Sequence, residues 1–113
     1  MIEVSRLAAQ GDVLFRRIEA MPGAVVEQPT AGRIVVAHSE TGHDHVVDDP
    51  AVALFEKIDR DPMICYLRVD GDFADVRHLR AYDTHQTLRL ARGLWEVRRQ
   101  REWAPEGWRR VAD

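Results

Sequence analysis

The amino-acid sequence predicts an all-β protein, either a single small β-barrel or a jelly-roll-like sandwich of about eight short strands. Apolar residues occur in short runs or alternate with polar ones, as they do in half-buried strands. Glycine, proline and aspartate interrupt these runs roughly every ten residues, the spacing of turns between short strands. The length of 113 residues is that of one domain. We therefore expect residues 1–113 to form a single domain, with a core over 10–103 and a loose tail over 104–113.

In the first half of the chain, β-branched and aromatic residues predict strands that breaker residues separate. The pattern over residues 2–9 also allows a brief N-terminal helix. A Met-Pro-Gly sequence at 21–23 and a Ser-Glu-Thr-Gly sequence at 39–42 are turn signals. Pro50 lacks the N–H that a strand ladder needs and is expected to end the strand over 43–47. The predicted strands are 11–19, 32–38, 43–47 and 51–58, of which 51–58 also fits a short helix, although a strand is favoured.

The second half continues in the same way. The sequence Asp-Gly-Asp at 70–72 is a hairpin signal, so we expect strands over 63–69 and 73–80 to pair with each other. Strand 85–90 then turns at 91–93 into the longest strand, 94–103. We expect alternate residues of these strands, such as Leu14, Tyr66 and Trp95, or their strand neighbours, to form the core.

Composition excludes several classes of protein. The single cysteine, Cys65, rules out a disulfide framework and a cysteine-rich zinc site. Residues 1–6 lack the basic-then-apolar order of a signal peptide, and no apolar run is long enough to cross a membrane, so we expect a cytoplasmic protein without a membrane partner. Arginine and tryptophan alternate near the C-terminus, but we expect the tryptophans to pack inward and the arginines to extend outward, so nucleic acid is not the expected partner.

Three of the five histidines, His38, His43 and His45, lie within eight residues. A four-residue hairpin loop at 39–42 would place His38 opposite His43, with both side chains on one face. His45 lies two residues further along that face, because side chains alternate along a strand. The three imidazoles are therefore expected to cluster.

Clustered neutral imidazoles are ligands for divalent transition metals, here zinc, iron or nickel. We expect His38, His43, His45 and His85 to ligate, with His85 contributed by a distant strand, and Glu40 to act as a general base at the rim. Two alternatives are open: the histidines serve only as hydrogen-bonding or solvent-facing groups, or they perform acid–base catalysis without a metal. Asp49 is a further carboxylate candidate.

Two other residues near this pattern have mainly structural interpretations. Asp12, after Gly11, is expected to open a strand from a turn, with a site carboxylate as the second interpretation. His78 is expected to stand apart from the cluster as a surface or packing histidine.

Three segments together resemble a family of small bacterial all-β proteins without an established activity. They are Gln-Gly-Asp-Val-Leu at 10–14, Ala-His-Ser-Glu-Thr-Gly-His-Asp-His at 37–45, and 93–103, which ends in Gln-Arg-Glu-Trp. The resemblance implies two histidines around two acids before the last strand. Asp83 and His85 match that stretch, whereas Tyr82 stands at the position of the first histidine. The spacing of His43, His45, Asp49 and His85 also resembles the layout of the cupins, which are metal-binding β-barrels, although Asp49 replaces their usual glutamate.

We therefore expect a small soluble metal-binding β-barrel protein. One version of this hypothesis is a metal-dependent enzyme of unknown substrate. The alternative is a non-catalytic binding or accessory module that acts through a protein partner. A homodimer is a third expectation, because the exposed edges of so short a barrel favour pairing with a second copy.

Overall fold

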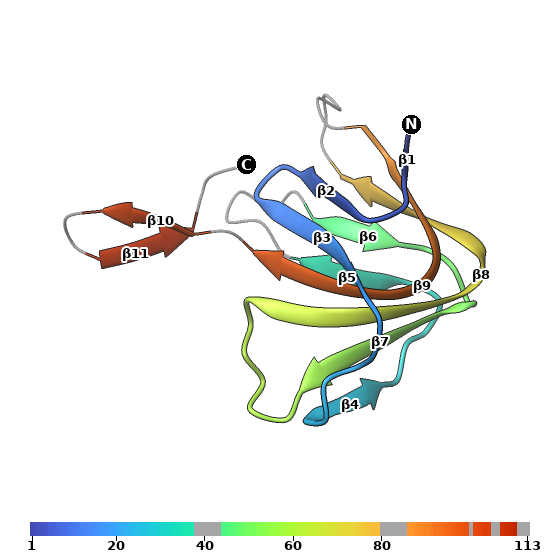
Figure 1. The fold of residues 1–113 in the computed structure, drawn as a ribbon, viewed down its shortest axis with the longest axis horizontal. Coiled ribbons are helices and arrows are strands. Elements are labelled where there is room, and N and C mark those ends of the chain that lie inside the picture. Colours follow the sequence, from blue (N-terminus) through green and yellow to red (C-terminus); the bar gives the residue numbers. More distant parts are fainter. Residues whose placement is uncertain (38–43, 80–85, 100, 105–106, 111–113) are drawn as a thin grey trace.

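The computed structural model describes residues 1–37, 44–79, 86–99, 101–104 and 107–110. Within these residues the chain forms eleven strands and no helix, which confirms the predicted all-β class (Figure 1). No described segment is a helix long and apolar enough to cross a membrane. The strands are β1 Ile2–Val4, β2 Leu7–Gln10, β3 Val13–Ile18, β4 Val25–Gln28, β5 Ile34–Ala37, β6 His45–Val47, β7 Val52–Lys57, β8 Ile64–His78, β9 Leu88–Arg99, β10 Arg101–Ala104 and β11 Gly107–Arg110.

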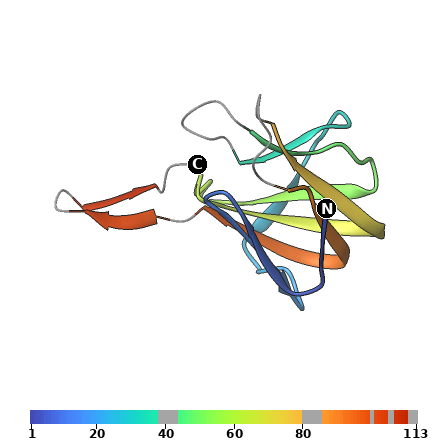
Figure 2. The same ribbon diagram turned by 90° about the horizontal axis from the view of Figure 1, so that it is seen from above.

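Two long strands, β8 and β9, form the centre of the sheet and change partners along their length. Their 64–69 and 94–98 parts belong to the strand order β2-β3-β9-β8-β7-β4. Their other parts belong to the order β1-β9-β8-β6-β5, in which β1 is parallel to β9. The two layers that result fold over each other like a sandwich with one shared corner (Figures 1 and 2).

The corner lies where β8 and β9 bend together. Their register shifts between Val69, which pairs with Gly93, and Phe73, which pairs with Ala91. The turns that we predicted at 70–72 and 91–93 are wrong, because both strands continue through these segments. The two groups of turn residues face each other across the ladder, and together they produce a bulge instead of two reversals.

The core fills the space between the two layers. It contains Val13 and Phe15 of β3, Leu67 and Val69 of β8, and Trp95 of β9, all at most 1% exposed. The indole N–H of Trp95 donates to the carbonyl of Ala91 at 2.9 Å, so this buried polar atom is paired.

The ends of the chain differ most from prediction. The helix allowed over 2–9 does not form: Ile2–Val4 forms β1, and Leu7–Gln10 forms β2. Strand β4 was not predicted. Strand 94–103 is divided, because β9 ends at Arg99 and β10 begins at Arg101. β10 and β11 pair as a two-stranded hairpin, and β11 lies within residues 104–113, which were expected to form the tail.

Candidate functional site

His45 occupies the first position of β6 and is fully buried. Its neighbours in the ladder are Ala37 of β5 on one side and His78 of β8 on the other. Just before it, the carbonyl of Asp44 accepts a hydrogen bond from the N–H of Leu79 at 2.8 Å. Three strand ends therefore fix the backbone that carries this imidazole.

Gln10, at the end of β2, determines which way the imidazole of His45 faces. Its Nε2 donates to the carbonyls of Val76 at 3.0 Å and Gln86 at 2.9 Å, which leaves Oε1 as the atom 2.9 Å from His45 Nδ1. Because Oε1 can only accept, Nδ1 of His45 must carry a proton. The other ring nitrogen, Nε2, then faces away from Gln10 with a lone pair or a second proton.

Asp12 lies on that other side of the ring. It follows Gly11, whose φ of 60° forms the turn between β2 and β3. Asp12 is 5% exposed, and its Oδ1 is 3.8 Å from His45 Nε2. Asp12 therefore opens a strand from a turn, as expected, and its carboxylate also lies beside His45. A carboxylate and an imidazole lone pair repel at this distance, and a proton on either group or a cation between the two atoms removes that repulsion.

His78 stacks on His45, with ring centroids 4.2 Å apart and planes 12° from parallel. It is 4% exposed. The expectation that His78 stands apart from the other histidines is therefore wrong. The lone pair of an imidazole lies in the ring plane, so two nearly parallel rings do not direct their nitrogens at one ion. We interpret His78 as the residue that packs against His45 and holds its ring plane.

Of the predicted ligands, only His45 lies within the described residues. His38, Glu40, His43 and His85 lie outside them, as do Tyr82 and Asp83. In the part of the chain that the structure describes, no three His, Cys, Asp or Glu side chains are arranged to hold a metal ion.

The described part of the predicted histidine hairpin contains one irregularity. Ile34 pairs with Val47 and Val35 with Val46, as a four-residue loop requires, but the register then shifts so that Ala37 instead of Val36 faces His45. The pairing predicted between His38 and His43 lies beyond this shift and outside the described residues.

Asp49 has a structural role. Its Oδ1 accepts the N–H of Ala51 at 2.8 Å, which closes the turn before β7. The carboxylate beside His45 belongs to Asp12 instead. Gln10 and His78 were missed as site residues, although Gln10 begins the first of the three motifs.

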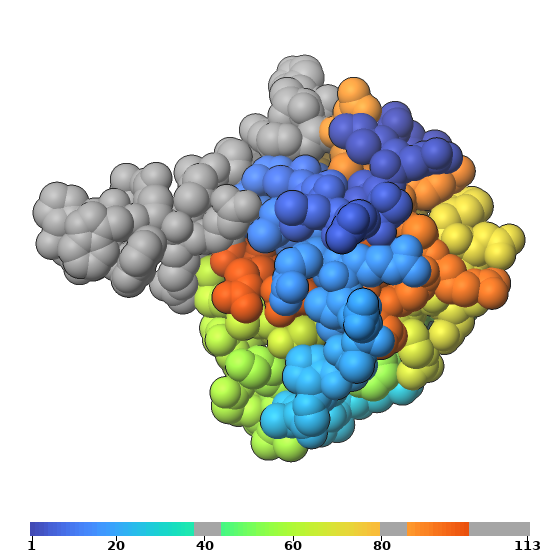
Figure 3. Space-filling model, in the orientation of Figure 1, coloured from blue at the N-terminus to red at the C-terminus, as the bar shows by residue number. Residues whose placement is uncertain are grey.

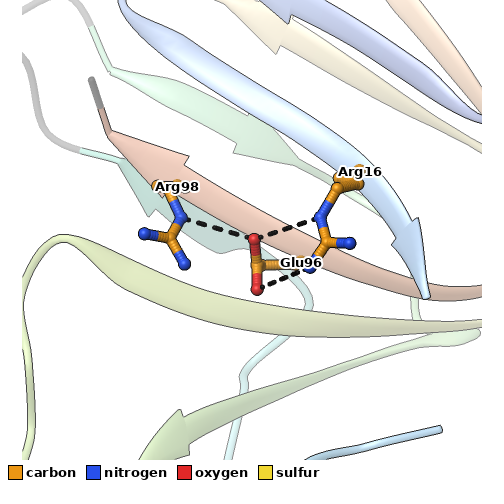
Figure 4. A network of polar contacts seen from close by, with 3 residues as sticks. All are labelled: Arg16, Glu96 and Arg98. Atoms are coloured by element: carbon orange, nitrogen blue, oxygen red, sulfur yellow. Dashed lines mark hydrogen bonds and ion pairs between the residues drawn. The ribbon is translucent and has the colours of Figure 1, made fainter.

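A second polar cluster lies on the opposite face of β9 from Trp95. Glu96 accepts hydrogen bonds from Nε and Nη2 of Arg16 at 3.4 and 3.3 Å, and from Nε of Arg98 at 3.4 Å (Figure 4). Burial alone would raise the pKa of Glu96, but the hydrogen bonds and charges of the two guanidinium groups lower it below its usual value. Arg16 and Arg98 are thus held in place by a carboxylate that is itself 8% exposed.

A family profile described as Domain of unknown function (DUF8820) matches residues 9–100. The matched range includes the motifs at 10–14 and 37–45 and most of the third. No curated protein matches the chain. No solved structure matches it either.

Proposed function

We propose that this chain, which belongs to the DUF8820 family, is a small metal-binding protein. The family match confirms the expected membership in a family of unassigned activity. In this proposal His45 ligates a divalent transition metal, zinc, iron or nickel, together with His38, His43 and His85. The observation that carries the proposal is the pair of contacts around His45, with Gln10 on one ring nitrogen and Asp12 near the other.

The contact with Gln10 is of the kind that positions a ligating histidine. Such residues usually donate their second ring N–H to a carbonyl or carboxylate, which fixes the ring and leaves the other nitrogen for the metal. The 3.8 Å between Asp12 Oδ1 and His45 Nε2 leaves room for one ion at about 2 Å from each atom. These contacts favour an ion on the Asp12 side of the ring.

The other proposed ligands directly follow or precede residues around His45. His38 follows Ala37, which pairs with His45, and His43 precedes Asp44, whose carbonyl is bonded to Leu79. His85 precedes Gln86, whose carbonyl accepts from Gln10. Each of the three histidines is therefore the immediate sequence neighbour of a described residue at the site, which supports their inclusion in the proposed ligand set.

A metal at this position would polarise a substrate oxygen or a bound water. Glu40, between His38 and His43 in sequence, would then act as the general base. We propose that the protein works in the cytoplasm as a small metal-dependent enzyme, with the metal layout of a cupin.

Elemental analysis tests the proposal. Tag-free protein, purified without chelator or nickel resin, should contain close to one equivalent of metal or take it up from zinc, iron or nickel salts. The His43→Ala, His45→Ala double variant should contain none. His78→Phe is the matched control, because it keeps an aromatic ring against residue 45 and should retain the metal. Equal metal content in the double variant and the parent would overturn the proposal.

A second candidate function rests on the C-terminal hairpin. β10 and β11 form a separate two-stranded sheet that extends away from the other strands (Figures 1 and 2). A lone two-stranded hairpin is marginally stable in water, so a surface that covers it would stabilise it. We propose that this hairpin binds a protein partner, which matches the alternative of an accessory module.

Size-exclusion chromatography with light scattering and affinity capture test this second function together. The full chain should recover a partner, or a second copy of itself, that a chain ending at Arg99 fails to recover. The Trp103→Ser, Trp108→Ser variant should fail in the same way, because these two residues are register partners in the hairpin. Recovery by the shortened chain would contradict the proposal.

A further inference from the structure

A cavity separate from the histidine site opens between the start of β2, the end of β3 and the middle of β9. Its volume is about 670 Å³, within the range of small-molecule sites. In Figure 3 the side chains of the N-terminal strands (blue) lie against those of β9 (orange). The residues that line it are Arg6, Leu7, Arg16, Arg17, Ile18, Glu19, Gly93 and Leu94.

The charge of this lining is strongly positive. Three guanidinium groups and a single carboxylate, Glu19, surround the cavity, in a chain whose net charge is −3. Guanidinium groups bind carboxylates and phosphates through paired hydrogen bonds. The local charge therefore favours an anion over a cation or a neutral ligand.

Two of the three guanidinium groups are already fixed in place. Arg17 donates from Nη1 to the carbonyl of Ser5 at 3.3 Å and from Nη2 to the carbonyl of Arg92 at 2.7 Å. Arg16 is held by Glu96 (Figure 4). Each of these arginines has N–H donors beyond those used in the bonds named here, because a guanidinium carries five. Fixing a side chain in advance lowers the entropy cost of binding.

Gly93 makes the position of Arg17 possible. A Cβ at residue 93 would lie 2.9 Å from Nη2 of Arg17, so only glycine allows this guanidinium to lie across the strand. The backbone of Arg17 is also tied to the loop beneath it, since its N–H donates to the carbonyl of Arg6 at 2.8 Å.

The rest of the lining is apolar. Leu7 is 60% exposed, and Ile18 and Leu94 are half-buried. Exposed leucine beside fixed arginines is the composition expected for a ligand with an apolar body and a charged end.

We propose that this cavity binds a small organic anion, with a carboxylate or phosphate group on Arg6, Arg16 and Arg17 and an apolar body on Leu7, Ile18 and Leu94. Arg6 makes no ion pair or side-chain hydrogen bond with any residue that the structure describes. We expect its guanidinium to close on the anion when the ligand binds.

NMR titration of the full ¹⁵N-labelled chain tests this site with hexyl phosphate, hexanoate, inorganic phosphate and hexanol as probes. We expect saturable shifts at the amides of Arg17, Ile18, Gly93 and Leu94 with at least one of the two organic anions. The one that binds more tightly identifies the charged group. Inorganic phosphate should bind more weakly, and hexanol should cause no saturable shift at these amides.

The Arg6→Gln variant should weaken binding of the preferred anion about tenfold, the usual loss for a charged hydrogen-bond donor. Arg60→Gln is the matched control, because Arg60 is an exposed arginine between β7 and β8 at the other end of the sheet. Equal weakening in both variants would show non-specific attraction and overturn the proposal. So would hexanol binding as tightly as the anions, inorganic phosphate binding as tightly as hexyl phosphate, or a lack of saturable shifts with both organic anions.

Discussion

Replacing Gln10 by leucine should destabilise the protein by about 3 kcal/mol, because two buried polar groups and one partly buried group lose their partner at once. These groups are the carbonyls of Val76 and Gln86 and the Nδ1–H of His45. Leucine has a similar volume, so the loss comes from hydrogen bonding and not from a cavity. Urea unfolding with a chelator present measures the effect without a contribution from bound metal.

Gln28→Leu is the control for this experiment. Gln28 ends β4 as Gln10 ends β2, but its single side-chain bond, to the carbonyl of Val26 at 3.3 Å, is exposed. The same substitution there should change the free energy of unfolding by about 0.5 kcal/mol or less. A Gln10→Leu protein as stable as the Gln28→Leu protein would mean that Gln10 does not hold the strand ends together.

Replacing Gly93 by alanine should destabilise the protein by about 2 kcal/mol. The φ of Gly93 is 142°, a conformation that residues with a Cβ rarely adopt. The new methyl group would also displace the guanidinium of Arg17 from the carbonyl of Arg92. Thermal and urea unfolding should both report the loss.

Gly23→Ala is the matched glycine control. A Cβ at residue 23 would have no heavy atom within 4 Å, and its φ lies outside the left-handed range. Alanine there should leave stability unchanged or raise it slightly, because it restricts the unfolded chain. The interpretation of the corner would be wrong if both glycines tolerated alanine equally.

Strands could be predicted well where side chains alternate. Strand 11–19 was found as β3 and strand 51–58 as β7, because β-branched residues on a half-buried surface favour a strand regardless of its partners. The face was harder to predict. Val13 and Phe15 are fully buried, whereas Leu14 is half-exposed, since alternation does not indicate which of two apolar sets faces the core.

The turns and the N-terminus failed for a different reason. Asp-Gly-Asp at 70–72 has the composition of a reversal, yet it lies in a strand because β9 bends beside it. Residues 2–4 form a strand through parallel pairing with Leu88–Leu90. Local sequence contains no information about a partner more than eighty positions away.

The site could be predicted only in part, because its residues come from positions that are distant in sequence. His45 was identified from its sequence neighbours, but Gln10 lies 35 positions before it and His78 lies on another strand. Only the order of the strands brings these side chains together. Asp12 was recognised as a second-choice site carboxylate, because the same sequence signal also fits the turn that it forms.

The central position of β9 has a consequence for how the chain reaches this structure. β9 pairs with β1, β3 and β8. It is also the last strand of its sheet in sequence, because β1 to β8 all precede it. A chain that emerges from the ribosome N-terminus first exposes Val13 and Phe15 until residues 94–99 are made. Native pairs such as Ile2 with Leu88 give a high contact order, which slows folding. Because the central strand β9 is synthesised after the strands that it joins, we expect the chain to fold after synthesis. Until then it depends on protection from aggregation.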